Sequence, residues 1–484
     1  MRVVARSVVV GFLAVLSAVI LGLTSTMTAA VTLVAASSVA LVMGGTGRPD
    51  PEQTYLDNVS QYYIYPNTFC AAAASCTTQT VITPEEFWPI PGWGGLNAIT
   101  FNQSTYEGLG ILDTTLQNQL AQNPEQNVVI FGYSQSARIT TLEMRKLADP
   151  AYTGIVPTPD QLEFVLIGNI NRPNGGILAR FPGLYIPILE VSFDGATPTD
   201  TGYKMTDIAL QYDGLADFPL YPINLLADLN AVAGFWYIHG TYPDPTRGVT
   251  IPPYGFDTVA AYEAALANPD NRQSYGPNNT YITIPVENLP ILQPLRDLGA
   301  STNTTAITEP IADLIQPTWT VLIETGYDRN IPYGQATHAR LIPIINPITL
   351  TTDLVKAGVE GVQDAVADIT GGTSPAPAAP LGALNVSKLA AENTIDTPNP
   401  DKPAAEPKVT LITPWKQLKE LNNAADKPSQ KTAIQAKPQR PKPLRDIGRE
   451  LQRVADTITN AIQRPSGTPA KGPGDTAHNG DAAA

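Results

Sequence analysis

The sequence predicts an α/β fold: a mostly parallel sheet with helices on both faces and long, lid-like loops. Two observations carry this prediction. Short apolar runs alternate with longer segments of helix-forming residues, which is typical of successive strand–helix–strand units. The run 128–131 is apolar at consecutive positions, as in a strand that is buried on both faces, and a tight turn and a helical segment follow it.

The remaining elements follow from the same patterns. We expect strands at 39–43, 128–131, 164–167 and 208–212, with a less distinct one at 281–284, and helices at 106–122, 136–147, 221–233 and 257–267. Two long stretches, 170–206 and 240–280, are rich in Pro, Gly and Tyr. Stretches of this length inside a domain are typical of functional loops, so we expect them to form a lid over a site.

Composition limits the classes of function. The chain has 484 residues, of which 43% are hydrophobic and 15% charged, so it can bury a large core. Its formal net charge of −14 argues against a nucleic-acid partner, because a polyanion would be repelled. Only three histidines are present, so we expect no metal centre built on histidine clusters. No motif indicates a cofactor.

The N-terminal segment predicts export. Arg2 and Arg6 precede an apolar run from Val8 to Leu23, and small and polar residues follow up to Ala30. This is the pattern of a secretory signal over 1–30, with an uncleaved membrane anchor as the alternative. We therefore expect an exported protein of the cell envelope, either secreted or membrane-associated.

The chain after the signal divides into three segments of different composition. We expect a catalytic domain over 38–345, a helical extension over 346–370 and a disordered tail over 371–484 that is rich in Ala, Pro and Lys. Within the tail, apolar residues recur at helical spacing over 444–463, beside several arginines. This pattern predicts an amphipathic helix that contacts an anionic membrane or envelope surface, or else a transient helix in water.

The two cysteines predict a disulfide. Cys70 and Cys76 are separated by five residues, and an exported chain meets an oxidising environment. The alternative is a pair of free thiols.

Residues 127–138 predict a catalytic serine. The strand 128–131 leads into Gly-Tyr-Ser-Gln-Ser and then into a helix. A serine in a sharp turn between a buried strand and a helix is the nucleophile elbow of serine hydrolases, because this turn lifts the hydroxyl clear of the sheet. Ser136 stands where the motif usually has a second glycine, and serine is small enough to fit. The alternative is a plain strand–turn–helix in which Ser134 is a surface residue.

A serine needs a base to take its proton. His478 lies in the tail, which leaves His239, just beyond the helix 221–233, and His338. The chain order in this fold class is nucleophile, acid, histidine, with the acid after a late strand. We favour His239, because it lies 22 residues beyond Asp217, close enough for one helix and a loop to return it to the same edge of the sheet.

Two carboxylates follow such a strand. Asp213 stands at the end of the strand 208–212, and Asp217 precedes Phe-Pro in the next turn. Either could orient a histidine and stabilise its charged form. We favour Asp217, because Asp213 beside Gly214 is also a common turn pattern.

Backbone N–H groups that stabilise an oxyanion are expected at two places. One is Gln135, directly after the serine. The other is the loop Gly44-Gly45-Thr46-Gly47, in which Gly45 and Thr46 are the candidate donors. A phosphate-binding loop is the alternative, but the Lys-Ser/Thr of a P-loop is missing.

Together these blocks resemble the PE-PPE domain, a cutinase-like α/β-hydrolase family of mycobacteria and their relatives. The resemblance rests on four blocks in order: Gly44–Gly47, Gly132–Ala137, Tyr212–Pro219 and Tyr221–Ala231 with its continuation to His239. It implies an exported serine esterase or acyltransferase, with Ser134 as nucleophile, His239 as base and Asp217 as the favoured acid. The N-terminal PE or PPE module that often precedes this domain is not found in this sequence. Members with a signal segment resemble acyltransferases that load fatty acyl chains onto trehalose glycolipids.

Three functions therefore stay open. The chain acts as an acyltransferase on acyl lipids or glycolipids, as a carboxylesterase or lipase on acyl esters, or as a non-catalytic envelope protein. The first two share one acyl-enzyme and differ only in whether a sugar hydroxyl or water attacks it.

Overall fold

The computed structural model describes residues 38–71, 76–243 and 253–371 of the chain. These residues belong to one compact unit, Met1–Glu392. The expected signal segment at 1–30 and the tail with its helix at 444–463 lie outside the described residues, so those expectations stay predictions.

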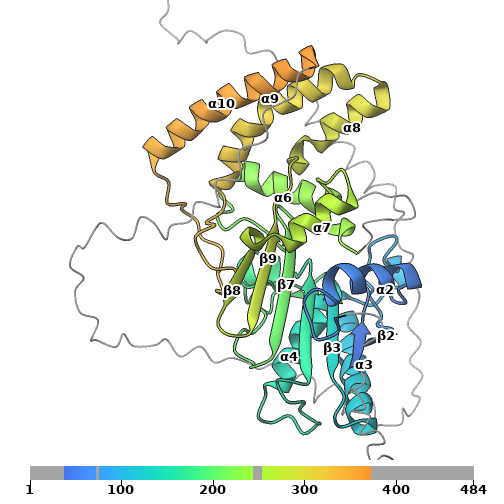
Figure 1. Ribbon diagram of the computed structural model, residues 1–484. Helices are drawn as coiled ribbons and strands as arrows, with labels where there is room; N and C mark the ends of the chain where they lie inside the picture. The colour runs from blue at the N-terminus through green and yellow to red at the C-terminus, as the bar shows by residue number, and fades with distance from the viewer. Residues whose placement is uncertain (1–37, 72–75, 244–252, 372–484) are drawn as a thin grey trace, which may run out of the picture. The chain divides into compact units, whose positions relative to one another are not determined.

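A seven-stranded sheet forms the centre of the fold, in the order β2-β1-β3-β4-β7-β9-β8 (Figure 1). All neighbouring strands run parallel except β8, which is antiparallel to β9. The strands are β1 Ser38–Val42, β2 Cys76–Thr80, β3 Val128–Tyr133, β4 Leu162–Ile167, β7 Lys204–Leu210, β8 Arg272–Tyr275 and β9 Asn279–Ile284. The central strands β1, β3 and β4 are buried throughout or nearly so, as their apolar runs predict.

Helices cover both faces of this sheet. The bounds are α2 Gln53–Val59, α3 Phe101–Gln122, α4 Gln135–Leu147, α5 Ile177–Arg180, α6 Leu225–Tyr237 and α7 Val259–Ala267. Side chains of α3 and α4 pack with Val128 and Ile130 of β3, whereas side chains of α2, α6 and α7 pack with Val129 and Phe131. Alternate residues of one strand thus belong to two cores. This is the α/β-hydrolase architecture that the sequence predicts.

Some elements differ from the expectation. The strands β2 and β8 were not predicted, because Cys-Thr-Thr-Gln-Thr and Arg-Gln-Ser-Tyr lack an apolar run. Both lie at the edges of the sheet, where burial is not needed. The helix expected at 221–233 begins later, at Leu225. Its N-cap is Asn224, whose side chain accepts a hydrogen bond from the N–H of Ala227. The stretch 240–280 includes α7 and β8 and is less irregular than expected.

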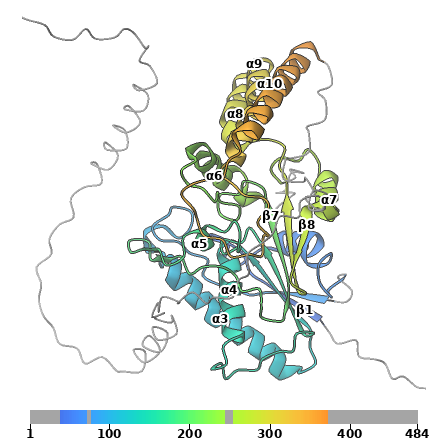
Figure 2. The same cartoon turned by 90° about the vertical axis from the view of Figure 1, so that its left-hand side faces the viewer.

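A helical group follows the sheet. It comprises α8 Gln293–Thr302, α9 Thr305–Glu324 and α10 Pro347–Thr370 (Figure 2). The helical extension expected at 346–370 corresponds to α10, which packs closely on α9: a Cβ at Gly361 would lie 2.2 Å from the carbonyl oxygen of Leu314. Among the described residues, no helix is both long and apolar enough to span a membrane.

Cys70 and Cys76 form a disulfide, as predicted, with an S–S distance of 2.01 Å. It joins the loop after the helical turn Ser60–Ile64 to the start of β2.

Candidate active site

The carboxyl ends of β1, β3 and β7 bring the site together. In a parallel sheet, the loops that follow the strands lie along one edge. The loop Gly44–Gly47 follows β1, Ser134 follows β3 and Asp213 lies in the turn after β7. Since β1 and β3 are neighbours in the sheet, the glycine loop and the serine turn lie side by side.

Ser134 occupies a strained turn between β3 and α4. Its backbone angles are φ 56° and ψ −111°, a region that residues other than glycine rarely adopt. Gly132 lets the strand and the helix meet, because a Cβ there would lie 2.6 Å from the carbonyl oxygen of Ser136 and from Oγ1 of Thr140. The local sequence therefore forms the elbow that it predicts.

Ser136 explains the departure from the usual motif. Its hydroxyl accepts a hydrogen bond from the N–H of Tyr133 at 2.8 Å and donates one to the carbonyl oxygen of Gly44. A glycine could make neither bond. The serine thus fixes the loop after β1 to the elbow.

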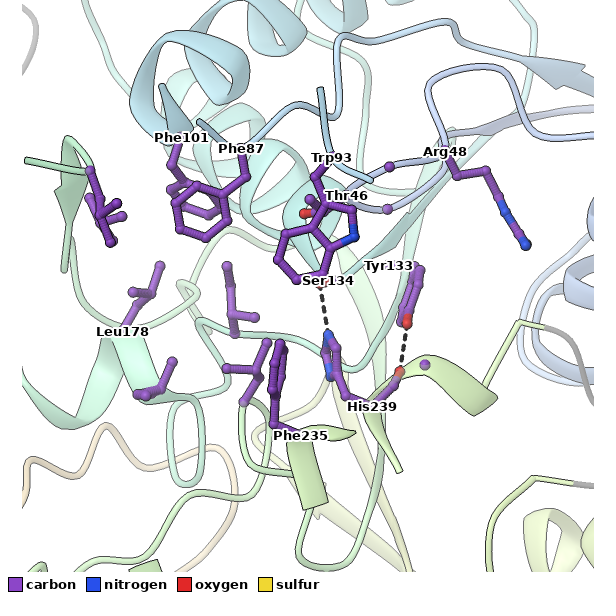
Figure 3. A pocket seen from close by; sticks show the side chains of 18 of the residues that line it. Thr46, Arg48, Phe87, Trp93, Phe101, Tyr133, Ser134, Leu178, Phe235 and His239 are labelled. Carbon is purple, nitrogen blue, oxygen red and sulfur yellow. Dashed lines mark hydrogen bonds between the residues drawn. The ribbon is translucent and has the colours of Figure 1, made fainter. Parts of the chain in front are cut away.

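Ser134 and His239, both favoured by the sequence, meet in the structure. The Ser134 hydroxyl lies 2.8 Å from Nε2 of His239 (Figure 3). Nδ1 of His239 lies 2.9 Å from both carboxylate oxygens of Asp213. All three side chains are buried. A serine, an imidazole and a carboxylate joined in this order can remove the serine proton and stabilise the imidazolium that results.

The favoured acid, Asp217, is not the residue beside the histidine; the structure places the alternative, Asp213, there. The Asp217 carboxylate instead binds Nη1 of Arg329 at 2.7 and 2.9 Å and accepts the N–H of Tyr212 at 2.9 Å. Its own N–H donates to the carbonyl oxygen of Asp213 at 2.8 Å. Asp217 therefore braces the turn that carries Asp213.

Hydrogen bonds hold Asp213 in its ionised form. Besides His239, the hydroxyl of Tyr242 donates to Oδ2 at 2.7 Å and the N–H of Leu215 donates to Oδ1 at 2.8 Å. Burial alone would raise the pKa of this carboxyl. The electrostatic interaction with His239 and these hydrogen bonds outweigh burial and hold the pKa of Asp213 below its ordinary value.

Aromatic rings fix the position of His239. Tyr133 stacks on the imidazole at 5.5 Å and Phe235 stacks on it at 6.2 Å. The Tyr133 hydroxyl also donates to the carbonyl oxygen of His239 at 2.5 Å. Gly234 lets α6 approach the Asp213 turn, because a Cβ there would lie 1.9 Å from the carbonyl oxygen of Tyr212. No local pattern in the sequence predicts these contacts or the Tyr242 hydrogen bond, because the partners lie far apart along the chain.

The candidate oxyanion donors surround the serine. Gln135 is the first residue of α4, where a backbone N–H has no acceptor within the helix. Its side chain is engaged elsewhere, with Ser104 and with the carbonyl oxygen of Glu86. In the glycine loop, Gly45 and Thr46 line the same pocket as Ser134.

The site opens into an apolar pocket of about 590 Å³. Its lining comes from several loops, and the stretch 170–206, predicted to cover a site, supplies much of it. In Figure 3 Phe87, Phe101 and Leu178 lie to one side of the Ser134–His239 pair. The apolar lining residues are Phe87, Trp93, Phe101, Ile170, Ile177, Leu178, Ile186, Leu189, Val191, Phe193, Leu215, Phe235 and Trp236. This lining suits an acyl chain.

Replacing His239 by Ala is expected to lower kcat/KM for a p-nitrophenyl ester about a thousandfold or more, because no other described base touches Ser134. His338 offers the matched control: it is exposed, in the loop between α9 and α10, and does not line the pocket. His338→Ala should keep activity within about twofold. If His338→Ala lost activity and His239→Ala kept it, the base would be His338.

No group of three or more His, Cys, Asp or Glu residues that could hold a metal ion occurs among the described residues.

Comparisons with known proteins identify the family of the chain. The PE-PPE domain family matches residues 74–328. The esterase PE16 of Mycobacterium tuberculosis is 41% identical over 340 residues, which are 68% of this chain and 57% of PE16. The diacyltrehalose acyltransferase Chp2 of the same organism is 29% identical, over 61% of this chain and 75% of its own length. The chain thus spans a little over half of the length of PE16.

Among solved structures, a cutinase-like protein from Cryptococcus sp. is 20% identical. The match covers 37% of this chain and 79% of that protein, with a TM-score of 0.26.

Proposed function

Since this chain belongs to the PE-PPE domain family, we propose that it is a serine-dependent acyltransferase or esterase of acyl lipids. One observation carries the proposal. The hydrogen-bonded series Ser134–His239–Asp213 opens into a pocket whose walls are apolar. A nucleophile needs an activated hydroxyl, and a fatty acyl group needs an apolar pocket beside it.

The first half of the reaction forms an acyl-enzyme. His239 Nε2 takes the proton of the Ser134 hydroxyl while Oγ attacks the ester carbonyl carbon. The carbonyl oxygen becomes an oxyanion, which the N–H of Gln135 and the N–H groups of the Gly45–Thr46 loop stabilise. The tetrahedral intermediate collapses, and His239 returns the proton to the departing alcohol. Asp213 stays a carboxylate throughout and holds the imidazole in place.

The second half repeats these steps with a new nucleophile. His239 takes a proton from an acceptor hydroxyl, the acceptor oxygen attacks the acyl carbon, and Ser134 leaves with the proton. A sugar hydroxyl as acceptor gives acyl transfer, and water gives hydrolysis. We favour transfer to a glycolipid such as an acylated trehalose, because an apolar lining limits water near the acyl-enzyme. The name of Chp2 supports this choice, and that of PE16 supports hydrolysis.

We further propose that the chain is exported to the cell envelope, as a secreted or membrane-associated protein. The N-terminal pattern with Arg2 and Arg6 supports this proposal, and so does the Cys70–Cys76 disulfide, since such bonds persist in oxidising compartments.

A product analysis tests the proposal. Purified full-length protein receives a long-chain acyl ester and an increasing amount of a trehalose lipid, and both free fatty acid and newly acylated glycolipid are quantified. We expect acylated glycolipid to exceed fatty acid at high acceptor concentration. Ser134→Ala is the control and should give neither product. If fatty acid exceeded acylated glycolipid at every acceptor concentration, the chain would be an esterase. If the wild type formed no more product than Ser134→Ala, the chain would be non-catalytic.

A further inference from the structure

Helix α6 carries an apolar stripe that faces solvent. Leu225, Leu229, Val232 and Trp236 are 70%, 58%, 56% and 75% exposed. Their spacing of four, three and four residues places them on one side of the helix. We call these four residues the α6 stripe. Single exposed apolar residues are ordinary, but a continuous row marks a surface that contacts something.

The opposite side of α6 already has its partners. Ala227, Ala231 and Gly234 are buried there. A Cβ at Gly326, in the turn after α9, would lie 2.5 Å from that of Ala227. These small residues let α6 pack closely on the domain, so its orientation is fixed and the stripe points away from the core.

The α6 stripe reaches the pocket. Trp236 belongs to the stripe and also lines the pocket, as does its neighbour Phe235, and His239 follows two residues after the helix ends. Figure 3 shows the Phe235 ring alongside the imidazole of His239, on which it stacks. The outer surface of this helix is thus continuous with the wall of the candidate active site.

A hairpin on another wall of the pocket also exposes apolar side chains to solvent. The two-stranded hairpin of β5 Tyr185–Ile186 and β6 Val191–Ser192 lines the pocket with Ile186 and Leu189. The same hairpin exposes Tyr185 (48%) and Ile188 (76%) to solvent. Two elements that form the pocket therefore both present apolar side chains outward.

Charge indicates what these surfaces contact. From Ile223 to Ile238 the only charged residue is Asp228, and from Tyr185 to Ser192 the only one is Glu190. The Glu190 carboxylate accepts a hydrogen bond from the Thr100 hydroxyl at 2.6 Å. A surface that is apolar and almost uncharged suits an apolar phase better than a charged partner. An acyl ester with a long chain is itself concentrated in lipid, where its chains lie in such a phase.

We propose that the α6 stripe and the β5–β6 hairpin dock the enzyme onto the surface of a lipid assembly, so that the acyl chain passes from lipid into the pocket without crossing water. This inference rests on the proposed function, because docking on lipid serves an enzyme only if its substrate is an acyl lipid. The docking itself is a binding property and can be measured without turnover.

The test compares two triple variants of the full chain. One changes the stripe at Leu225→Gln, Leu229→Gln and Val232→Gln, none of which lines the pocket. The matched control changes Ile82→Gln, Ile155→Gln and Val156→Gln, which are 58%, 46% and 51% exposed, do not line the pocket and form no row on a helix. Each is assayed on a soluble short-chain ester and on a long-chain acyl ester in phosphatidylcholine vesicles.

We expect the stripe variant to lose about tenfold or more of its activity on vesicles, because three apolar contacts with lipid are gone, and to stay within about twofold on the soluble ester. The control variant should resemble the wild type on both substrates. Equal loss of the stripe variant on both substrates would overturn the proposal, since a docking surface has no role with a soluble ester. Equal loss of both variants on vesicles would also overturn it.

Vesicle flotation separates docking from catalysis. In a Ser134→Ala background, the protein should float with phosphatidylcholine vesicles and the stripe variant should not. Binding should persist at about 1 M salt, where charges are screened within about 3 Å, because the contact is apolar. If high salt abolished binding, the attachment would belong to the basic tail and the proposal would be refuted. A dimer of the protein that the stripe substitutions dissociate would refute it too. Flotation of a protein that turns over neither ester would reject the proposed function alone.

Discussion

Ser134→Ala is expected to lower kcat for ester turnover by about five to six orders of magnitude, because the acyl-enzyme cannot form without the hydroxyl. The thermal melt should stay nearly unchanged. At a backbone φ of 56°, alanine is as strained as serine, so the substitution adds no strain. The one hydrogen bond described for the Ser134 side chain is that with His239. Hydrolysis of a p-nitrophenyl ester and labelling by a fluorophosphonate probe measure the effect.

Ser136→Ala is the matched control for this experiment. Ser136 lies two residues further in the same turn, and its hydroxyl binds Tyr133 and Gly44 but not the histidine. The variant should still react with the probe, at a reduced rate, because the glycine loop is less firmly held. Activity above about a tenth of the wild type in Ser134→Ala would refute the assignment of the nucleophile.

Asp213→Asn and Asp217→Asn should separate into a catalytic and a structural phenotype. Asp213→Asn is expected to lower kcat by about three to four orders of magnitude, because an amide can neither fix the imidazole tautomer nor stabilise its charge. The melt should fall only modestly. The single amide oxygen can keep the hydrogen bond from the N–H of Leu215, and the amide nitrogen, which then faces Tyr242, can donate to its hydroxyl oxygen.

Asp217→Asn should behave in the opposite way. It removes the charge that faces Arg329, whose guanidinium keeps only Glu324 as an acidic partner. We expect a loss of about 2–3 kcal/mol in the free energy of unfolding, with kcat retained within about tenfold. Denaturant unfolding and ester kinetics measure the two effects. If Asp217→Asn abolished turnover in a stable protein and Asp213→Asn did not, the acid would be Asp217.

These variants bear on the one point at which sequence reasoning chose wrongly between two residues. Asp213 and Asp217 stand four positions apart in the same turn, and both follow the strand that should carry the acid. Local pattern cannot separate them. The difference arises from Arg329, which is 112 residues beyond Asp217 and binds it in the folded chain.

What the sequence determined by itself is local. The apolar run of β3, the glycine at 132 and the helix formers after Gln135 are consecutive, so their pattern alone predicts the elbow and Ser134. The order of nucleophile, acid and base along the chain, together with the position of His239 one helix and a loop beyond Asp217, sufficed to favour His239 over His338. The disulfide needed only two cysteines at short separation.

The tertiary structure decided what depends on distant segments. The polar edge strands β2 and β8 exist because a neighbouring strand offers hydrogen bonds, and no apolar run announces them. The pocket is lined by loops, helices and a hairpin between residues 45 and 243, and its apolar character appears only when they meet. Asp213 became the partner of His239 for the same reason: packing of α6 on the turn, and of Arg329 on Asp217, fixes which carboxylate is left for the imidazole.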